Sequence, residues 1–276
     1  MRRSLTALAA AALATTLFAG TPALAQGSGK VEVLWLGQAA FRITSPTGKV
    51  IVIDPWLKTN PKTPAAFKDL KALGKVDVVL VTHAHFDHVA DAAELAKLNG
   101  TKLFVPPGLG ATLTNLGIIE PGVAPGMNKS GIATPIGPDI KLHMVRAEHS
   151  SEYAYKDPAT GKTTSYPGGE PVGWIVELEN GFKIYHMGDT GLFGDMKLIG
   201  DVYKPDLVLL PIGGNFTINA NLGALAVREF IKPKYALPMH YGTFPILAGK
   251  PEDFAKGMEG SGVRVVVPQP GDQVTF

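Results

Sequence analysis

Three histidines and an aspartate within six residues constrain the fold of this chain more than any other feature. The block reads Thr82-His83-Ala84-His85-Phe86-Asp87-His88. It follows Val76–Val81, an apolar run typical of a buried strand, and it precedes an amphipathic helical pattern over residues 87–98. The pattern therefore predicts that these four side chains lie on one turn at the carboxyl edge of a sheet, where open α/β sheets place their ligand sites.

The spacing of the four side chains indicates two metal ions. In an extended segment His83 and His85 project to the same side, so both imidazoles can meet one ion, while Asp87 and His88 turn towards a second position. Imidazole and carboxylate are donors for Zn²⁺, Mn²⁺ or Fe²⁺, and four such groups exceed what one catalytic ion with an open position needs. In the alternative interpretation, Asp87 only caps the helix and the histidines lie on the surface. That interpretation gives the histidines no folding benefit, and burial without metal would leave polar groups unsatisfied.

Three further candidate ligands each follow a predicted strand and begin a loop. They are His149, Asp189 and His240. Because strand ends on a shared sheet edge can converge, we expect these side chains to complete the metal sites. The remaining histidines lie inside strands. We expect His143 to be a half-buried strand residue, and we leave open whether His186 is a partner of Asp189.

Composition excludes several classes of protein. The chain has 276 residues, 45% of them apolar, and no cysteine, which allows a large core but neither disulfides nor thiol chemistry. Lys and Arg number 26 against 24 Asp and Glu, and there is no basic tract. This balance argues against nucleic acid as a partner and leaves a small-molecule substrate. The sequence gives no prediction of oligomeric state.

The first 25 residues have the features of a signal peptide. Arg2 and Arg3 precede the apolar stretch Leu5–Ala19, and Ala23-Leu24-Ala25 offers small residues for cleavage after position 25. The alternative is an uncleaved anchor, but this stretch is shorter than the roughly 20 residues that span a bilayer. We therefore expect a periplasmic or secreted protein without a stable membrane anchor, whose mature domain covers residues 26–276.

The rest of the chain predicts an α/β fold. Roughly a dozen short strands and a few helices in about 250 residues, without a linker, indicate one domain of two sheets flanked by helices. An antiparallel meander is expected at the N-terminus, a polar, mobile loop at Lys156–Gly169, and an irregular surface segment at Pro106–Pro138. The expected meander strands are Val31–Trp35, Phe41–Ile43 and Val50–Ile53, and helices are expected at Pro64–Leu73 and Asn221–Ile231.

The order of motifs resembles the metallo-β-lactamase superfamily. The order is His-x-His-x-Asp-His, a lone His, Gly-Asp-Thr and a late His. The match covers nearly all of Val31–Phe276 and is closest to a branch of metal-dependent hydrolases, with ascorbate-phosphate lactonases and N-acylphosphatidylethanolamine phospholipases D as more distant relatives. The motifs of this branch are Trp35-Leu36-Gly37, Ile53-Asp54-Pro55-Trp56-Leu57, His149-Ser150-Ser151, Met187-Gly188-Asp189-Thr190 and Pro238-Met239-His240-Tyr241-Gly242.

The resemblance implies a metallo-β-lactamase fold, which is an αββα sandwich of two mixed β-sheets flanked by helices. It also implies a ligand assignment. His83, His85 and His149 would hold one ion. Asp87, His88 and His240 would hold the other, and Asp189 would bridge the two.

Two positions depart from this branch. Gln38 stands where relatives carry a His after Trp-x-Gly, and Ile218-Asn219-Ala220-Asn221 replaces an acidic run. Neither position is a candidate ligand. Gln38 keeps hydrogen-bond donor and acceptor groups but cannot titrate near neutral pH, which argues against a general-acid role there.

These observations lead to the hypothesis of an exported dinuclear metal-dependent hydrolase. A metal-bridging hydroxide would attack an ester, lactone, phosphodiester or amide bond, with Asp87 and Asp189 at the reaction centre. We expect two divalent ions, zinc first and manganese or iron as alternatives. The other class that remains open is a periplasmic metal-binding or substrate-binding protein on the same fold with little or no turnover.

Supporting roles are expected for a few further residues. Asp54 either holds a ligand imidazole by its outer N–H or starts a turn before Pro55. Tyr241 either donates its hydroxyl to an oxyanion or leaving group, or packs. Asn215 and Ser150 are further candidate donors. Selectivity is expected from the segments 106–138 and 156–169.

Overall fold

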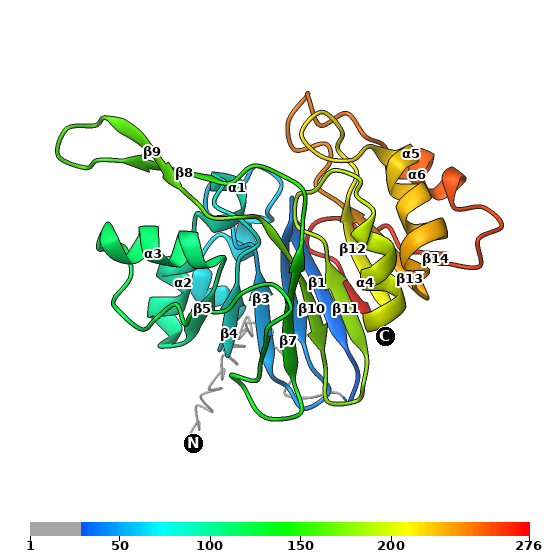
Figure 1. Ribbon diagram of the computed structural model, residues 1–276, viewed down its shortest axis with the longest axis horizontal. Coiled ribbons are helices and arrows are strands. Elements are labelled where there is room, and N and C mark those ends of the chain that lie inside the picture. The colour runs from blue at the N-terminus through cyan, green and yellow to red at the C-terminus, as the bar shows by residue number, and fades with distance from the viewer. Residues whose placement is uncertain (1–28) are drawn as a thin grey trace, which may run out of the picture.

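The computed structural model describes residues 29–276 as a sandwich of two large β-sheets with helices on both outer faces (Figure 1). The expected αββα architecture is therefore confirmed. The proposed signal peptide, residues 1–25, lies outside the described residues. Within the described range, none of the helices has the length and apolar character needed to span a bilayer.

The first sheet has the strand order β15-β1-β2-β3-β4-β5. Strands β1, β2 and β3 pair antiparallel, which confirms the predicted meander, and β3, β4 and β5 pair in parallel. Side chains on both faces are buried because alternate residues of one strand enter different cores. Val33 and Trp35 face the second sheet, whereas Leu34 and Leu36 face the helices. The strands are β1 (Glu32–Gly37), β2 (Ala40–Thr44), β3 (Val50–Ile53), β4 (Val78–Leu80), β5 (Lys102–Phe104) and β15 (Gln273–Thr275).

The second sheet has the order β14-β13-β12-β11-β10-β7-β6. The strands from β6 to β11 pair antiparallel, and those from β11 to β14 pair in parallel. The carboxyl ends of β11, β12 and β13 therefore reach the same edge. The strands are β6 (Ile132–Ala133), β7 (Lys141–Arg146), β10 (Val172–Glu177), β11 (Lys183–His186), β12 (Leu207–Pro211), β13 (Tyr235–Met239) and β14 (Arg264–Val265).

Three apolar layers hold the sandwich together. Phe41 and Trp174 belong to the layer between the sheets, Leu95 to the layer under the first group of helices, and Met196 and Phe254 to the layer under the second. These layers fix the sheet edge on which the histidines lie. The first group of helices is α1 (Phe86–Val89), α2 (Ala92–Asn99) and α3 (Pro107–Asn115), and the second is α4 (Asp195–Tyr203), α5 (Ala220–Leu225) and α6 (Pro251–Gly257).

Three expected helices are each divided in two. The segment Pro64–Leu73 forms two short 3-10 helices, because the Asp69 carboxylate accepts the Lys71 N–H (3.0 Å) and starts a new turn. The helix expected over residues 87–98 is split at Asp91 into α1 and α2. The segment Asn221–Ile231 belongs to α5 and then to a turn of π-helix over Ala226–Ile231.

The prediction of two irregular segments is wrong in part. Residues 106–138 contain α3, with Pro107 at its first turn, where a missing N–H costs nothing. Residues 156–169 are not a loop throughout, because residues 163–167 form a strand. Strands β8 (Glu152–Lys156) and β9 (Thr163–Pro167) pair antiparallel and project from the sandwich as a hairpin (Figure 1). Asp157 closes the turn, since its carboxylate accepts the N–H groups of the second and third residues that follow it, at 2.7 and 3.0 Å.

Candidate metal centre

The structure brings all seven candidate ligands to one edge of the sandwich. They come from four places in the chain: the segment after β4, the loop after β7, the loop after β11 and the loop after β13. They form two groups, within each of which the candidate ligand atoms lie within 4.8 Å of one another. The first group is His83, His85 and His149, and the second is Asp87, His88, Asp189 and His240.

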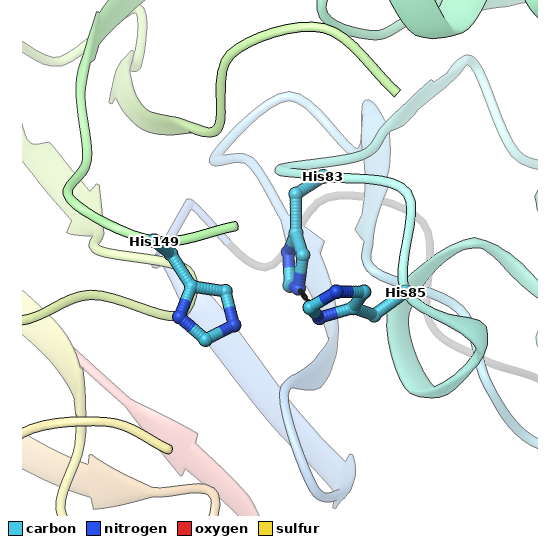
Figure 2. A group of neighbouring side chains, drawn as sticks. All are labelled: His83, His85 and His149. Carbon is cyan, nitrogen blue, oxygen red and sulfur yellow. Dashed lines mark hydrogen bonds between the residues drawn. The ribbon is translucent and has the colours of Figure 1, made fainter. Parts of the chain in front are cut away.

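The first group consists of imidazoles only. His83 Nε2 lies 3.0 Å from His85 Nδ1, and the His149 ring approaches both from a separate loop, with its centroid 5.1 Å from each of theirs (Figure 2). Burial lowers the pKa of His83 well below its usual value, and the neighbouring His88 lowers it further. Burial also lowers the pKa of His149. These two rings are therefore neutral at pH 7, which is the form that binds a metal ion.

The outer nitrogen of His85 faces the start of the β8–β9 hairpin. His85 Nε2 lies 3.5 Å from Ser150 Oγ and 3.5 Å from a carboxylate oxygen of Glu152. His85 Nδ1 faces His83 and is the nitrogen available to an ion, whereas Nε2 faces the hairpin. The expected donor Ser150 thus contacts a candidate ligand directly.

The second group pairs two carboxylates with two imidazoles. His240 Nε2 lies 3.0 Å from Asp189 Oδ2 and 3.3 Å from Asp87 Oδ2, and His88 Nε2 lies 3.4 Å from Asp189 Oδ1. Burial by itself lowers the pKa of His240, but the Asp189 carboxylate outweighs it and raises that pKa to about 9. For Asp87, burial raises the pKa, and the charges of His88 and His240 outweigh this and lower it to about 2.

The charge of the second group matches that of a divalent ion. Burial disfavours charge on His88, yet Asp189 and Asp54 raise its pKa well above the usual value, so both imidazoles of the group are protonated without metal. Two imidazolium and two carboxylate groups sum to zero. Replacing the two protons by one divalent cation keeps that sum, so metal binding here adds no net charge to the buried group.

Buried atoms that make no hydrogen bond, and whose close neighbours are other candidate ligands, indicate that these residues fit metal ions. Among the described residues, His88 Nε2, His149 Nε2, His240 Nε2 and Asp189 Oδ1 are buried and make no hydrogen bond. A buried polar atom without a partner costs about 1–3 kcal/mol. Four such atoms directed into one cluster are the donor set that a cation satisfies.

Asp54 holds one of the imidazoles. Its Oδ2 lies 2.8 Å from His88 Nδ1 and accepts the Thr82 hydroxyl (2.7 Å), and its Oδ1 accepts the Thr82 N–H (2.7 Å). Asp54 is fully buried and has a φ of +49°, a conformation that a non-glycine residue adopts only when its surroundings hold it. The sequence left open whether Asp54 holds an imidazole or starts a turn, and the contact made is with the imidazole.

Sequence reasoning missed the contacts of Gln38. Its side-chain amide donates a hydrogen bond to Asp87 Oδ2 (2.8 Å), and its main-chain carbonyl accepts the His240 N–H (3.1 Å) and the Trp35 indole N–H (3.1 Å). Gln38 is 1% exposed and has a φ of +51°. A polar residue between two apolar strands was the available signal, but its partners lie far away in the sequence.

Two expected supporting residues do not contact the cluster. The Tyr241 ring packs against Trp35, with centroids 5.6 Å apart, and its hydroxyl makes no hydrogen bond to a described residue. Burial, followed by the charge of Glu252, raises the pKa of Tyr241 to about 12. Asn215 is exposed with a φ of +56°, and its side chain makes no hydrogen bond within residues 29–276.

The two strand histidines lie outside the cluster. His143 is 7% exposed, more buried than expected, and packs against Tyr203 (5.2 Å between ring centroids). His186 does not pair with Asp189. Its Nε2 lies 2.9 Å from the Ala39 carbonyl oxygen, and its Nδ1 accepts the Gly188 N–H (3.2 Å). It thus shapes the turn that leads to Asp189.

Comparisons with known proteins identify the family of this chain. The family described as "Beta-lactamase superfamily domain" matches residues 49–241. A UPF0173 metal-dependent hydrolase of Cupriavidus necator is 58% identical over 257 residues, covering 92% of this chain and 89% of its own. One from a Polaromonas species is 57% identical over 249 residues, covering 90% and 91%. The solved structure of Igni18, a metallo hydrolase from Ignicoccus hospitalis, has a TM-score of 0.77 at 35% identity, covering 90% of this chain and 98% of its own.

Proposed function

Since this chain belongs to the metallo-β-lactamase superfamily and is a metal-dependent hydrolase, we propose that its seven converging side chains hold two divalent cations. Zinc is the first candidate, with manganese or iron as alternatives, because imidazole and carboxylate suit all three. The proposed reaction is hydrolysis of an ester, lactone, phosphodiester or amide bond in a small molecule. The observation that carries the proposal is the convergence of seven candidate ligands into two groups, four of whose buried atoms make no hydrogen bond.

When bound, such a pair of ions lowers the pKa of water towards about 7 and polarises the oxygen of the scissile bond. The residues of the chain orient and confine this chemistry. Asp189 lies between the groups: one oxygen lies near His88 and the other lies 3.0 Å from His240 and 3.7 Å from His149. This position supports a bridging role. The hydrogen bond from Gln38 fixes the orientation of Asp87.

Tyr241 takes a packing role in this proposal. Its ring lies against Trp35 and its hydroxyl is not directed at a candidate ligand by any hydrogen bond. Gln38 has a positioning role in this proposal. Its side-chain amide donates a hydrogen bond to Asp87, and this role does not require a side chain that titrates.

Elemental analysis and substitution test this proposal together. Purified protein should contain about two equivalents of zinc, manganese or iron. A panel of lactone, thioester, β-lactam and bis(p-nitrophenyl) phosphate substrates then identifies the bond that is cleaved. His88→Ala and Asp189→Ala should each abolish turnover with the circular dichroism spectrum retained. His143→Ala is the matched control, since this histidine lies outside both groups. Near-normal activity in both site variants would reject the dinuclear centre, and metal content without hydrolysis of any substrate would favour a binding protein.

We also propose that the chain is exported and acts in the periplasm or outside the cell. Residues 1–25 support this through their arginine pair, apolar stretch and Ala-Leu-Ala ending. Intact mass and N-terminal sequencing of protein from a periplasmic fraction should give Gln26 as the first residue. Protein that retains Met1 and stays in the cytoplasmic fraction would reject the proposal.

A further inference from the structure

Three aromatic rings lie beside the candidate metal centre. Phe86 is edge-on to Trp56, with ring centroids 5.4 Å apart, and lies 6.4 Å from Phe244. Trp56 and Phe244 stack at 5.8 Å with an interplanar angle of 21°. We call Trp56, Phe86 and Phe244 the aromatic rim. Its rings contact one another, although they come from three separate segments of the chain.

Each ring of the aromatic rim is carried by a segment that also carries a residue of the site. Phe86 lies between His85 and Asp87 in the sequence, Trp56 follows Asp54 by two positions, and Phe244 follows His240 by four. Trp56 is 3% exposed and donates its indole N–H to Thr59 (2.7 Å), so it is fixed in place. Phe86 is 59% exposed. The rim therefore has a rigid base and an uncovered apolar face.

The exposed candidate ligands include both sequence neighbours of Phe86, His85 and Asp87. The side chains of His85, Asp87 and His149 are 29%, 12% and 10% exposed, whereas those of His88, Asp189 and His240 are at most 3% exposed. Two of the three more exposed residues flank Phe86 directly. On the other side of His85 lie Ser150 and Glu152, which are polar. His85 therefore has polar side chains at its outer nitrogen and the apolar Phe86 as its neighbour in the sequence.

We propose that the aromatic rim binds an alkyl or aryl group of the substrate whose hydrolysable bond lies at the metal centre. This inference rests on the proposed function and names the class of substrate: an ester, lactone or amide with an apolar substituent on one side of the bond. Ligand sites combine apolar and aromatic side chains with a few convergent polar groups, which is the combination that the aromatic rim and the candidate ligands offer. A methylene group that becomes buried on it raises affinity about fourfold.

Binding of hydroxamic acids tests the aromatic rim without depending on which bond is cleaved. The hydroxamate group chelates zinc, and its tail can be varied. Hexanohydroxamate has four more methylenes than acetohydroxamate, and burial of two of them gives about fifteenfold tighter binding. Isothermal titration calorimetry on zinc-loaded protein measures this ratio. Phe86→Ala and Phe244→Ala should each reduce it to about threefold or less, while the Kd of acetohydroxamate and the zinc content stay close to those of the unaltered protein.

Two further variants make the result specific. Leu198→Ala removes a side chain of similar exposure (61%) on α4, outside the aromatic rim, and should leave the ratio unchanged. Phe86→Leu keeps an apolar side chain and should retain most of the ratio, which separates loss of contact from displacement of the neighbouring ligands.

The possible failures are distinguishable. If acetohydroxamate does not bind to protein incubated with zinc, the metal centre itself is wrong and the inference falls with it. If acetohydroxamate binds but the hexanoyl tail adds less than about threefold, or if both rim variants keep the full ratio, the metal centre stands and the aromatic rim is not a substrate surface. A change of oligomeric state in Phe86→Ala with an unchanged ratio would assign the exposed ring to a contact between chains and would also reject the inference.

Discussion

Replacing Asp54 by asparagine should weaken zinc binding without unfolding the protein. In Asp54→Asn one side-chain oxygen remains to accept the Thr82 N–H, but an NH₂ group replaces the oxygen that lies 2.8 Å from His88 Nδ1. That NH₂ group cannot accept a hydrogen bond from the imidazole N–H. His88 then either loses its partner or places its proton on Nε2, the nitrogen that faces Asp189 at 3.4 Å and would bind the ion.

The size of the effect follows from burial. Both side chains of the pair are fully buried, so water cannot replace the lost contact. Loss of the group that orients a metal-binding histidine typically reduces metal affinity roughly 10- to 100-fold, which corresponds to about 1.4 to 2.7 kcal/mol. The unsatisfied donor left in the folded protein should lower the free energy of unfolding by about 1–3 kcal/mol.

Competition with a chromophoric chelator measures the zinc affinity, and urea unfolding of the metal-free protein measures stability. The matched control is Asp77→Asn. Asp77 lies just before β4, whereas Thr82 and the candidate ligands follow the other end of this strand. The Asp77 carboxylate accepts the Val50 N–H (2.9 Å) and pairs with Lys75, but contacts no candidate ligand. Asp77→Asn should leave zinc affinity within about twofold. Unchanged affinity in Asp54→Asn, or an equal loss in the control, would refute the reasoning.

Three other predictions concern Gln38, His240 and Tyr241. Gln38→Ala removes the hydrogen bond to Asp87 and should lower the affinity for the zinc ion of the second group about tenfold, measured by the same competition. Unchanged affinity for both zinc ions would reject a positioning role. His240 has its pKa raised from 6.5 to about 9, so in metal-free protein its ion pairs stabilise the fold below about pH 6.5, and this contribution is lost as pH rises through 9. The melting temperature of chelator-treated protein should fall over this range more than that of zinc-loaded protein, and parallel profiles would contradict the assignment. Tyr241→Phe should keep kcat within about twofold on whichever substrate is cleaved, because only the ring makes a contact; a loss of a hundredfold or more would restore the hydroxyl as a proton donor.

The parts of the fold that could be predicted are those with continuous apolar runs. Val50–Ile53 and Val76–Val81 read as buried strands because both faces of the first sheet are covered, and the structure places β3 and β4 within them. The hairpin after Ser150 could not be predicted in the same way. Its strands have no buried residue, and the alternation of Tyr153 and Tyr155 in β8 covers only five residues; the strands are joined by main-chain pairing and a contact between Tyr155 and Tyr166.

Helix α4 was missed for a different reason. Its buried face contains Gly200 beside Met196 and Ile199, and a Cβ at Gly200 would lie 2.5 Å from the Phe230 carbonyl oxygen. Close packing of two backbones thus requires a residue that weakens the helical signal in the sequence. Helix α6 is short and has one fully apolar anchor, Phe254, which leaves little periodicity to detect.

For the candidate site, the sequence could place the residues at strand ends but could not bring them together. The block from His83 to His88 is local, so its geometry follows from one strand and one helix start. The approach of His149, Asp189 and His240 depends on the pairing of β7, β10, β11, β12 and β13, which is set by contacts between distant parts of the chain. The same reason hid Gln38, whose amide meets a carboxylate 49 positions away.

Anomalous diffraction from crystals of the zinc-loaded protein tests the central claim most directly. Data recorded on both sides of the zinc absorption edge should show two peaks, one among His83, His85 and His149 and one among Asp87, His88 and His240, with Asp189 between them. A single peak, or zinc bound away from these side chains, would contradict the dinuclear centre.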